Sequence, residues 1–352
     1  MNNMHVIKIG GSILKDLNDL SLIKDKLRDC HNCIIVTSAL KNVTNMLIEA
    51  TETKNTGIIN NIYDMHMNIG KNYLDGNSAL ILKKFRDELL NLVSMNINIS
   101  LRDRILSYGE RMATLILYNF LKDNNFGVSY ILDPFIVTDN NFGDANFIYD
   151  YTEKNIKSIH FNDLTVIPGF TGKTLNNEIT TLGRGGSDYT AMIIGSILNA
   201  NVRIITDVPG IMTSDPKIFK NSKTLNEVSI KEALKMSYFG VKNFNYKAFT
   251  PVIDKNIEIT VESLYNDNKT VITRNETNTL KCVALAGYNT LNKNMLVFIG
   301  HGINEKNISN NIITYLGKNH LYYKDDLSLS VVLDDDIINN KKCFEVASSW
   351  IK

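Results

Sequence analysis

The chain has 352 residues, with 38 Lys and Arg against 37 Asp and Glu, and a formal net charge of +1 at pH 7. A nearly neutral chain has no global field to attract nucleic acid or an anionic membrane surface, so we expect a small-molecule or protein partner. Hydrophobic residues make up 44% of the chain, enough for a large core. No apolar run reaches the roughly 18 residues of a membrane span, and the N-terminus lacks the apolar region of a signal peptide. These features predict a cytoplasmic protein of two or three domains.

The four cysteines are Cys30, Cys33, Cys282 and Cys343, and their spacing is not that of a disulfide framework. Cys30 and Cys33 form a C-x-x-C pair without a second pair, whereas a zinc site usually needs four ligands. A redox pair would stand at a helix start after a strand, but this pair leads into the strand expected at 33–37. We therefore expect reduced thiols.

The chain begins with a short apolar strand at His5–Ile9, followed at once by Gly10-Gly11-Ser12 and a helical pattern over 13–27. Lys8 stands at the strand end, and a lysine in an apolar strand is costly unless its ammonium group reaches an anion. The N–H groups of the two glycines could hold a phosphate there. A lysine that extends to solvent from an edge strand is the less favoured alternative. The glycine spacing fits neither a P-loop nor a G-x-G-x-x-G fingerprint.

A second glycine-rich turn lies in the run Thr181–Ala191, which has glycines at positions 183, 185 and 186. Ser187 and Asp188 are expected to cap the apolar helix that follows at 191–199. A glycine turn at a helix N-terminus is an anion site, and Arg184 adds a fork that holds a carboxylate or phosphate at two points. Taken alone, the run fits a tight turn with a solvated arginine equally well.

Segments typical of strands and helices alternate from residue 5 to about 265, which predicts an α/β fold with a mainly parallel sheet. The expected strands are 5–9, 33–37, 130–132, 164–168, 202–206 and 257–261. The expected helices are 13–27, 46–53, a long helical region over 58–122, 191–199 and 230–236. After about 275, strands at 280–286, 295–299, 321–323 and 327–333 with helices at 303–316 and 337–350 predict a small α+β unit.

Six motifs occur in the order typical of aspartate kinases of the amino-acid kinase family, and the chain resembles that family from residue 5 to its end. The motifs are Lys8-Ile9-Gly10-Gly11-Ser12, Thr37-Ser38-Ala39 with Val43-Thr44-Asn45, Gly109-Glu110-Arg111, Gly169-Phe170 with Thr181–Ala191, Thr206-Asp207 to Asp215-Pro216, and Phe239-Gly240-Val241-Lys242. The third and fourth motifs resemble the family's G-E-R and T-L-G-R-G-G-S-D-[YF]-[ST]-A elements. The fourth motif also distinguishes aspartate kinases from other kinases of the same fold.

The resemblance implies transfer of the γ-phosphoryl group of ATP to the side chain of L-aspartate, the first step toward lysine, threonine and methionine. The implied catalytic residues are Lys8 and Asp188. The implied substrate residues are Ser38, Thr44, Glu110, Phe170, Arg184 and Ser187, with Arg184 on the α-carboxylate and Glu110 on the ammonium group. The implied nucleotide residues are Lys8, Gly10, Gly11, Ser12, Thr206, Asp207, Met212, Lys217, Lys242 and Asn243. Mg²⁺ would accompany the nucleotide phosphates, and no residue is assigned as a metal ligand.

The resemblance also implies a three-layer catalytic domain over 1–270 and a ferredoxin-like ACT domain over 275–352. The family normally carries two ACT domains, and here only one is expected. A single ACT-like domain would pair with that of another subunit, so we expect a homo-oligomer, at least a dimer. The chain departs from the family pattern at Met212, Lys217 and Asn245-Tyr246, where many members have Tyr, Arg and His-Pro. These departures concern nucleotide binding.

Two alternatives remain open. One is an enzyme of the same fold that acts on a glutamate-type substrate, and the other is a catalytically silent sensor of ATP and amino acids. The kinase assignment requires the Lys8 turn and the Arg184 turn to lie together. Turns on opposite sides of the molecule would exclude the kinase assignment.

Overall fold

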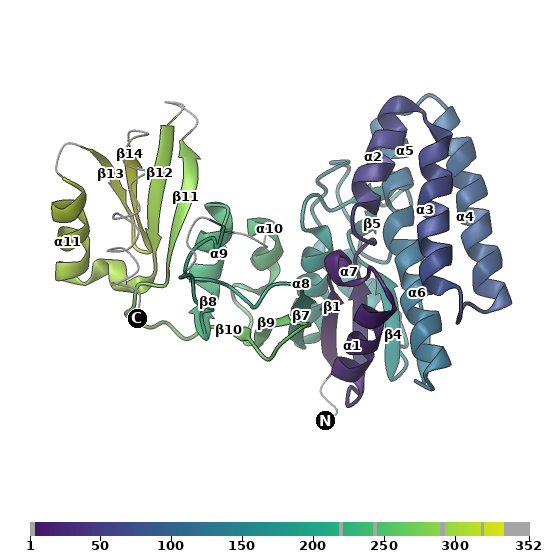
Figure 1. Ribbon diagram of the computed structural model, residues 1–352, viewed down its shortest axis with the longest axis horizontal. Helices are drawn as coiled ribbons and strands as arrows, with labels where there is room; N and C mark the ends of the chain where they lie inside the picture. Colours follow the sequence, from purple (N-terminus) through teal and green to yellow (C-terminus); the bar gives the residue numbers. More distant parts are fainter. Residues whose placement is uncertain (1–3, 218–220, 242–244, 289–292, 318–319, 334–352) are drawn as a thin grey trace. The chain divides into compact units, whose positions relative to one another are not determined.

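The computed structural model describes residues 4–217, 221–241, 245–288, 293–317 and 320–333 (Figure 1). The chain divides into two compact units. Unit 1 comprises Met1–Asp207 and Ser263–Asn266, and unit 2 comprises Val208–Glu262 and Asp267–Lys352. This division reflects how compact each unit is. The boundary expected between a catalytic domain ending at 270 and an ACT domain beginning at 275 stays a prediction.

Unit 1 is built on parallel strands in the order β3-β4-β2-β1-β7. Their bounds are β1 His5–Ile9, β2 Cys33–Thr37, β3 Val128–Tyr130, β4 Leu164–Pro168 and β7 Asn201–Thr206. The predicted α/β fold with a mainly parallel sheet is confirmed. Because β1 lies between β2 and β7, Lys8 is on a central strand, and the alternative of an edge-strand lysine is wrong.

Both faces of this sheet are covered by helices. Ile7, Ile9 and Ile35 belong to one core with the helices of the N-terminal half, which Figure 1 shows as a separate layer. Val6 and Val36 are equally buried and point to the other face, since successive side chains of a strand alternate. There α8 (Gly186–Leu198) contacts β1, β2 and β7. Burial on both faces explains why these strands are continuously apolar.

The helices of the first layer are α1 Leu17–Leu27, α2 Val43–Thr53, α3 Thr56–Gly70, α4 Gly76–Ser94, α5 Ile99–Leu106 and α6 Tyr108–Asp123. Four of them, α3 to α6, make up the long helical region expected over 58–122. The helix expected at 13–27 is divided into the short η1 (Gly11–Ile13) and α1, with Asp16 as the N-cap of α1. The remaining elements of unit 1 are β5 Thr171–Lys173, β6 Ile179–Thr181 and α7 Tyr149–Ser158.

Unit 2 contains a second, antiparallel sheet in the order β11-β12-β14-β13. Its elements are β11 Cys282–Tyr288, β12 Lys293–Ile299, β13 Leu321–Lys324 and β14 Ser328–Leu333, with η3 His301–Asn304 and α11 Lys306–Leu316. Phe298, Ile312 and Val331 share one core, so α11 packs on this sheet. The sheet and α11 agree with the expected α+β unit. The helix expected at 337–350 lies outside the described residues.

The other elements of unit 2 are β8 Glu227–Ser229, β9 Ile259–Ser263, β10 Lys269–Thr273, α9 Ile230–Tyr238, α10 Tyr246–Phe249 and η2 Thr250–Val252. The prediction of 257–261 as the last strand before the C-terminal region is wrong, because β10 follows. β10 has a polar, threonine-rich sequence and depends on its neighbours. It pairs antiparallel to β9 and parallel to β8, and Thr270 Oγ1 donates to the Leu225 carbonyl at 2.6 Å.

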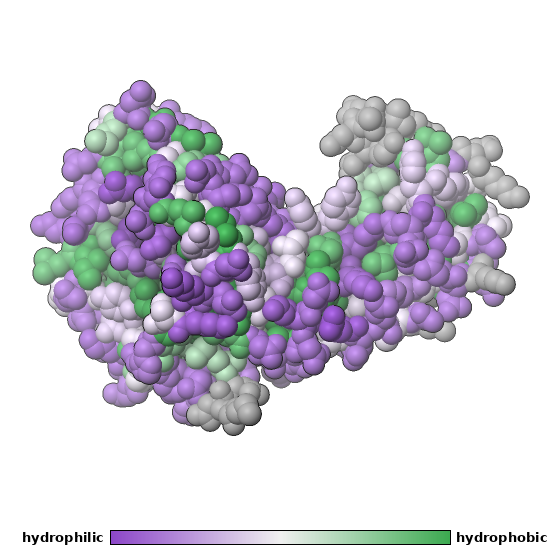
Figure 2. All heavy atoms as spheres, turned by 180° about the vertical axis from the view of Figure 1, so that it is seen from behind, coloured by the Kyte–Doolittle hydropathy of each residue, from purple (hydrophilic) through white to green (hydrophobic). Residues whose placement is uncertain are grey.

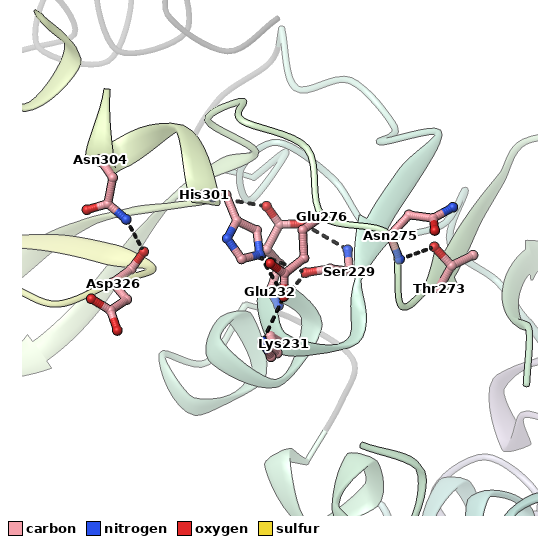
Figure 3. Close-up of polar contacts among 9 residues, drawn as sticks. All are labelled: Ser229, Lys231, Glu232, Thr273, Asn275, Glu276, His301, Asn304 and Asp326. Atoms are coloured by element: carbon pink, nitrogen blue, oxygen red, sulfur yellow. Dashed lines mark hydrogen bonds and ion pairs between the residues drawn. The ribbon is translucent and has the colours of Figure 1, made fainter. Parts of the chain in front are cut away.

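A buried carboxylate ties α9 to the segment that follows β12. Glu232 is 0% exposed, and its Oε2 accepts the N–H of Ser229 at 2.8 Å while its Oε1 accepts that of His301 at 3.1 Å. Ser229 completes a capping box by accepting the N–H of Glu232 at 3.1 Å. Figure 3 shows these side chains gathered around His301, with the more exposed pair Lys231–Glu276 beside them.

We expect Glu232→Ala to lower the free energy of unfolding by about 2–4 kcal/mol, because it leaves the buried N–H of Ser229 and the partly buried N–H of His301 without their acceptor and removes half of a capping box. Lys231→Ala is the matched control from the same helix turn. It breaks only an exposed ion pair and should cost about 0–1 kcal/mol. Urea denaturation followed by circular dichroism measures both. Equal losses for the two variants would contradict a structural role for the buried carboxylate.

Within the described residues, the search for a helix that is both long and apolar enough to cross a bilayer finds none. The face shown in Figure 2 is mainly hydrophilic, with hydrophobic residues in scattered patches.

Candidate functional site

The two glycine turns meet at an ion pair. Lys8 is the next-to-last residue of β1, and its Nζ lies 2.8 Å from Asp188 Oδ1 in the first turn of α8. The two side chains are only 12% and 7% exposed. Both turns therefore lie at the carboxyl edge of the parallel sheet, where open α/β sheets bind ligands. The expectation that the turns converge is confirmed.

The first turn passes very close to the end of β2. A Cβ atom at Gly11 would stand 2.1 Å from the carbonyl oxygen of Ala39, so only glycine fits there without a shift of the backbone. The expectation that both glycines offer N–H groups to a phosphate is wrong for Gly10, whose N–H donates to the Ile205 carbonyl at 3.0 Å. The N–H groups of Gly11 and Ser12 lie in the first turn of η1, where a helix leaves its donors without internal partners.

The second turn connects β6 to α8 and carries Arg184 at its exposed tip. Gly183 and Gly185 have φ of +78° and +71°, which glycine adopts readily. The expectation that Ser187 and Asp188 are N-cap residues is wrong, because α8 begins at Gly186 with Gly185 as its N-cap. Asp188 is instead inside the first helical turn, where the positive end of the helix dipole favours a carboxylate.

The segment after β4 packs directly on the start of α8. The N–H of Gly169 donates to the Thr37 carbonyl at 2.9 Å, and a Cβ atom at Gly169 would stand 2.8 Å from Ser187 Cβ. Phe170 has a φ of +68°, an unfavourable conformation for a bulky residue, and its N–H donates to Thr190 Oγ1 at 3.0 Å. Strained residues of this kind cluster at ligand sites.

Glu110 is buried beside the end of β2. It is 3% exposed, and its Oε2 has no hydrogen-bond partner among the described residues. Burial raises the pKa of Glu110 to about 8, although the N–H groups of Ala39 and of Glu110 itself act in the opposite direction. Although Glu110 stands in the first turn of α6, its side chain does not face solvent. A buried carboxyl with a free oxygen is suited to a cationic ligand group.

This raised pKa makes the stability of the chain depend on pH. The folded state keeps the Glu110 proton up to about pH 8, whereas the ordinary pKa is 4.5. Between pH 4.5 and about pH 8, the folded chain therefore binds more protons than the unfolded chain. The contribution of Glu110 to the free energy of unfolding is complete at low pH and is lost as pH rises through this range. Glu110→Gln removes the titration. We expect the variant to gain stability relative to wild type between about pH 5 and about pH 8 in urea titrations; parallel curves would contradict this assignment.

The other predicted residues of unit 1 lie at the same edge or next to it. Ser38 follows β2 and donates its N–H to the Ile9 carbonyl at 3.1 Å, and Thr44 is half-buried in the first turn of α2. Thr206 ends β7, and its Oγ1 donates to Asp207 Oδ1 at 3.2 Å. A Cβ atom at Gly10 would stand 3.7 Å from Thr206 Oγ1 and 3.8 Å from Lys8 Nζ.

The remaining nucleotide residues belong to unit 2 or are not described. Met212 forms an isolated bridge with Thr224, and Lys217 is exposed, with its N–H donating to Asp215 Oδ1 at 2.9 Å. Lys242 and Asn243 lie outside the described residues. Cys33 and Cys282 carry free thiols. A search of the described residues for three or more His, Cys, Asp or Glu that could hold a metal ion finds no such group.

The sequence reasoning missed Asp103, which is 0% exposed in α5 and accepts hydrogen bonds from Thr181 and Gly143. Its neighbours Arg102 and Arg104 suggest an exposed, charged helix face, so the burial of Asp103 could not be predicted from the local composition. The apolar residues Ile105 and Leu106, both buried, were the available signal that this turn of the helix faces inward.

Known proteins resemble this chain in sequence and in fold. A family model described as the amino acid kinase family matches residues 3–263. The bifunctional aspartokinase/homoserine dehydrogenase of Buchnera aphidicola is 28% identical over 290 residues, which are 75% of this chain and 35% of that protein. The lysine-sensitive aspartokinase 3 of Escherichia coli is 28% identical over 281 residues, 75% of this chain and 62% of that protein.

The crystal structure of E. coli aspartokinase III in complex with aspartate and ADP has a TM-score of 0.76 and 22% identity, covering 99% of this chain and 84% of that chain. At this identity the likeness shows the fold. The chain spans less than two thirds of the length of both curated relatives, 35% and 62%. Because the family model covers most of the chain and the two glycine turns meet at the sheet edge, this chain belongs to the amino acid kinase family.

Proposed function

We propose that this chain is an aspartate kinase, which transfers the γ-phosphoryl group of ATP to the side-chain carboxylate of L-aspartate and gives ADP and 4-phospho-L-aspartate. The observation that carries the proposal is the ion pair of Lys8 with Asp188, which joins the two glycine turns at one edge of the sheet. The aspartokinases among the relatives support the choice of substrate.

Phosphoryl transfer depends on positioning and on charge neutralisation more than on covalent chemistry. The acceptor is already a carboxylate, so no strong general base is needed. The ammonium group of Lys8 would balance the negative charge that moves with the phosphoryl group. Asp188 holds Lys8 in place through their 2.8 Å contact. The two residues thus have the roles of charge stabiliser and orienting carboxylate.

The amino acid would be held by opposite charges at its α-carbon. Arg184 would bind the α-carboxylate with its two-pronged guanidinium group. Glu110 would bind the ammonium group, which gives its unsatisfied Oε2 a partner and favours its ionised form. Ser38, Thr44, Phe170 and Ser187 would complete the pocket.

The triphosphate would lie against Lys8 and the N–H groups of Gly11 and Ser12, with Gly10 allowing close approach of the backbone. Thr206, Asp207, Met212, Lys217, Lys242 and Asn243 are the further residues proposed for the nucleotide. Asp188 is a buried carboxylate beside Lys8, which fits Mg²⁺ bound mainly through phosphate oxygens and water. When bound, Mg²⁺ supplies charge neutralisation on the nucleotide phosphates.

We also propose a domain organisation and an oligomeric state for this chain. A catalytic domain over 1–270 and an ACT-like domain over 275–352 fit the presence of the antiparallel sheet with α11 in unit 2. We propose a cytoplasmic homo-oligomer, at least a dimer, joined through the ACT-like domain.

A substrate panel tests the proposal. ADP release is followed with aspartate, glutamate, acetylglutamate and UMP as acceptors, and turnover with aspartate alone, or fastest with aspartate, is expected. Preference for glutamate or acetylglutamate would favour the other enzymes of this fold. Binding of ATP without turnover of any acceptor would favour the silent sensor.

A further inference from the structure

A single buried carboxylate joins three segments next to the candidate site. Asp103 in α5 is 0% exposed. Its Oδ2 accepts the N–H of Thr181 at 2.7 Å and that of Gly143 at 2.8 Å, and its Oδ1 accepts the hydroxyl of Thr181 at 3.0 Å. Burial raises the pKa of Asp103, and these donors act in the opposite direction. The carboxylate therefore has one specific partner at the end of strand β6 and another in the loop at Gly143.

The partners of Asp103 lead directly to the Arg184 turn. Thr181 is the last residue of β6, and only Leu182 and Gly183 stand between it and Arg184. The second loop supports the turn as well. The N–H of Ala145 donates to the Thr181 carbonyl at 2.9 Å, and Asp144 Oδ1 lies 2.2 Å from where a Cβ atom of Gly183 would stand. Asp103 thus holds both β6 and the loop at 143–145, the two segments that support the turn bearing Arg184.

The other end of α5 leads to Glu110. The N–H of Ser107 donates to the Asp103 carbonyl at 3.0 Å, and Ser107 is both the C-cap of α5 and the N-cap of α6. Glu110 follows in the first turn of α6. No loop separates the two helices, so Asp103 is connected through rigid backbone to Glu110 and through hydrogen bonds to the Arg184 turn.

We propose that Asp103 is a positioning residue that fixes Arg184 relative to Glu110, and thereby sets the fit of the site to the carboxylate and ammonium groups of an amino-acid substrate. This inference rests on the proposed function, since it takes Arg184 and Glu110 as the two groups that hold the substrate's α-carbon. Asp103 itself touches neither substrate nor nucleotide in this arrangement.

The test compares Asp103→Ala with Asp103→Asn. The alanine variant loses all three hydrogen bonds, so the Arg184 turn can shift. Misplacement on the scale of an ångström is costly, and we expect the KM for aspartate to rise about tenfold or more, with the KM for ATP little changed. In Asp103→Asn the amide oxygen can still accept both N–H groups and the amide nitrogen can donate to the Thr181 hydroxyl. This variant should restore most of the affinity for aspartate.

Asn119→Ala is the matched control for loss of a buried polar tie. Asn119 is 1% exposed and accepts the N–H of Asp75 at 3.2 Å, away from the Arg184 turn. It should lower stability without changing either KM. If Asp103→Ala does not fold, Thr181→Val removes only the hydroxyl contact to Oδ1 and should raise the KM for aspartate in the same direction by a smaller factor.

Hydrogen exchange of the peptide covering 179–186 provides a readout that does not need activity. We expect faster exchange in Asp103→Ala than in wild type and near-normal exchange in Asp103→Asn. Equal rises in both KM values, an asparagine variant as impaired as alanine, or unchanged exchange in Asp103→Ala would each overturn the positioning role. A wild-type chain that turns over none of the acceptors would overturn the proposed function, and the exchange measurement would still decide whether Asp103 holds the turn.

Discussion

Replacement of Lys8 by alanine should lower turnover by a factor of about 10²–10³, the scale seen when one preorganised transition-state donor is lost. The reason is the position of the ammonium group. It belongs to the next-to-last residue of a central strand, is almost shielded from water, and lies where the two glycine turns meet. An interaction that strengthens as charge moves in the transition state affects turnover more than substrate binding. Steady-state ADP release at saturating aspartate and ATP measures the effect.

Lys15→Ala is the matched control for Lys8. Lys15 also pairs with an aspartate, Asp19, at 3.4 Å, but its side chain is 45% exposed and it lies beyond the glycine turn. Its loss should leave turnover near that of wild type. Because Lys8→Ala also leaves Asp188 without its cation, circular dichroism must show that the variant is folded before rates are compared. A folded Lys8→Ala variant with near-normal turnover would remove Lys8 from the mechanism.

The strands that bear the site were predictable because burial on both faces gives an uninterrupted apolar pattern. The expected bounds of β1, β2 and β4 coincide with the observed ones. Each is followed by glycine or a small polar residue, and in a parallel sheet these ends share one edge. The convergence of Lys8 with Asp188 therefore follows from local pattern and topology together.

Other features depend on contacts that no local pattern contains. β10 is polar and forms because β8 and β9 pair with it. Gly10 uses its N–H within the fold because β7 lies beside it. The raised pKa of Glu110 arises from burial beside the end of β2. The role proposed for Asp103 arises from its contacts with β6 and with the loop at Gly143, both distant from it in sequence. Such features need the tertiary structure, since each is defined by the partner and not by the residue.

Replacement of Arg184 by alanine should raise the KM for aspartate far more than the KM for ATP. A hydrogen bond to a charged group contributes about 1.5–3 kcal/mol, so loss of the guanidinium fork should weaken aspartate binding by about 10- to 100-fold. The nucleotide is proposed to lie against Lys8 and the first glycine turn, which this change leaves intact. Initial rates measured over a matrix of aspartate and ATP concentrations separate the two constants.

Two further variants identify the cause of such a change. Arg184→Lys keeps the charge but loses the planar, two-pronged geometry, so it should recover only part of the affinity for aspartate. Arg28→Ala removes an arginine whose side chain is 72% exposed and paired with Asp25 at the end of α1, and it should change neither KM. Equal effects of Arg184→Ala on both KM values would refute the carboxylate assignment. Full recovery in Arg184→Lys would show that the site needs only a positive charge at this turn.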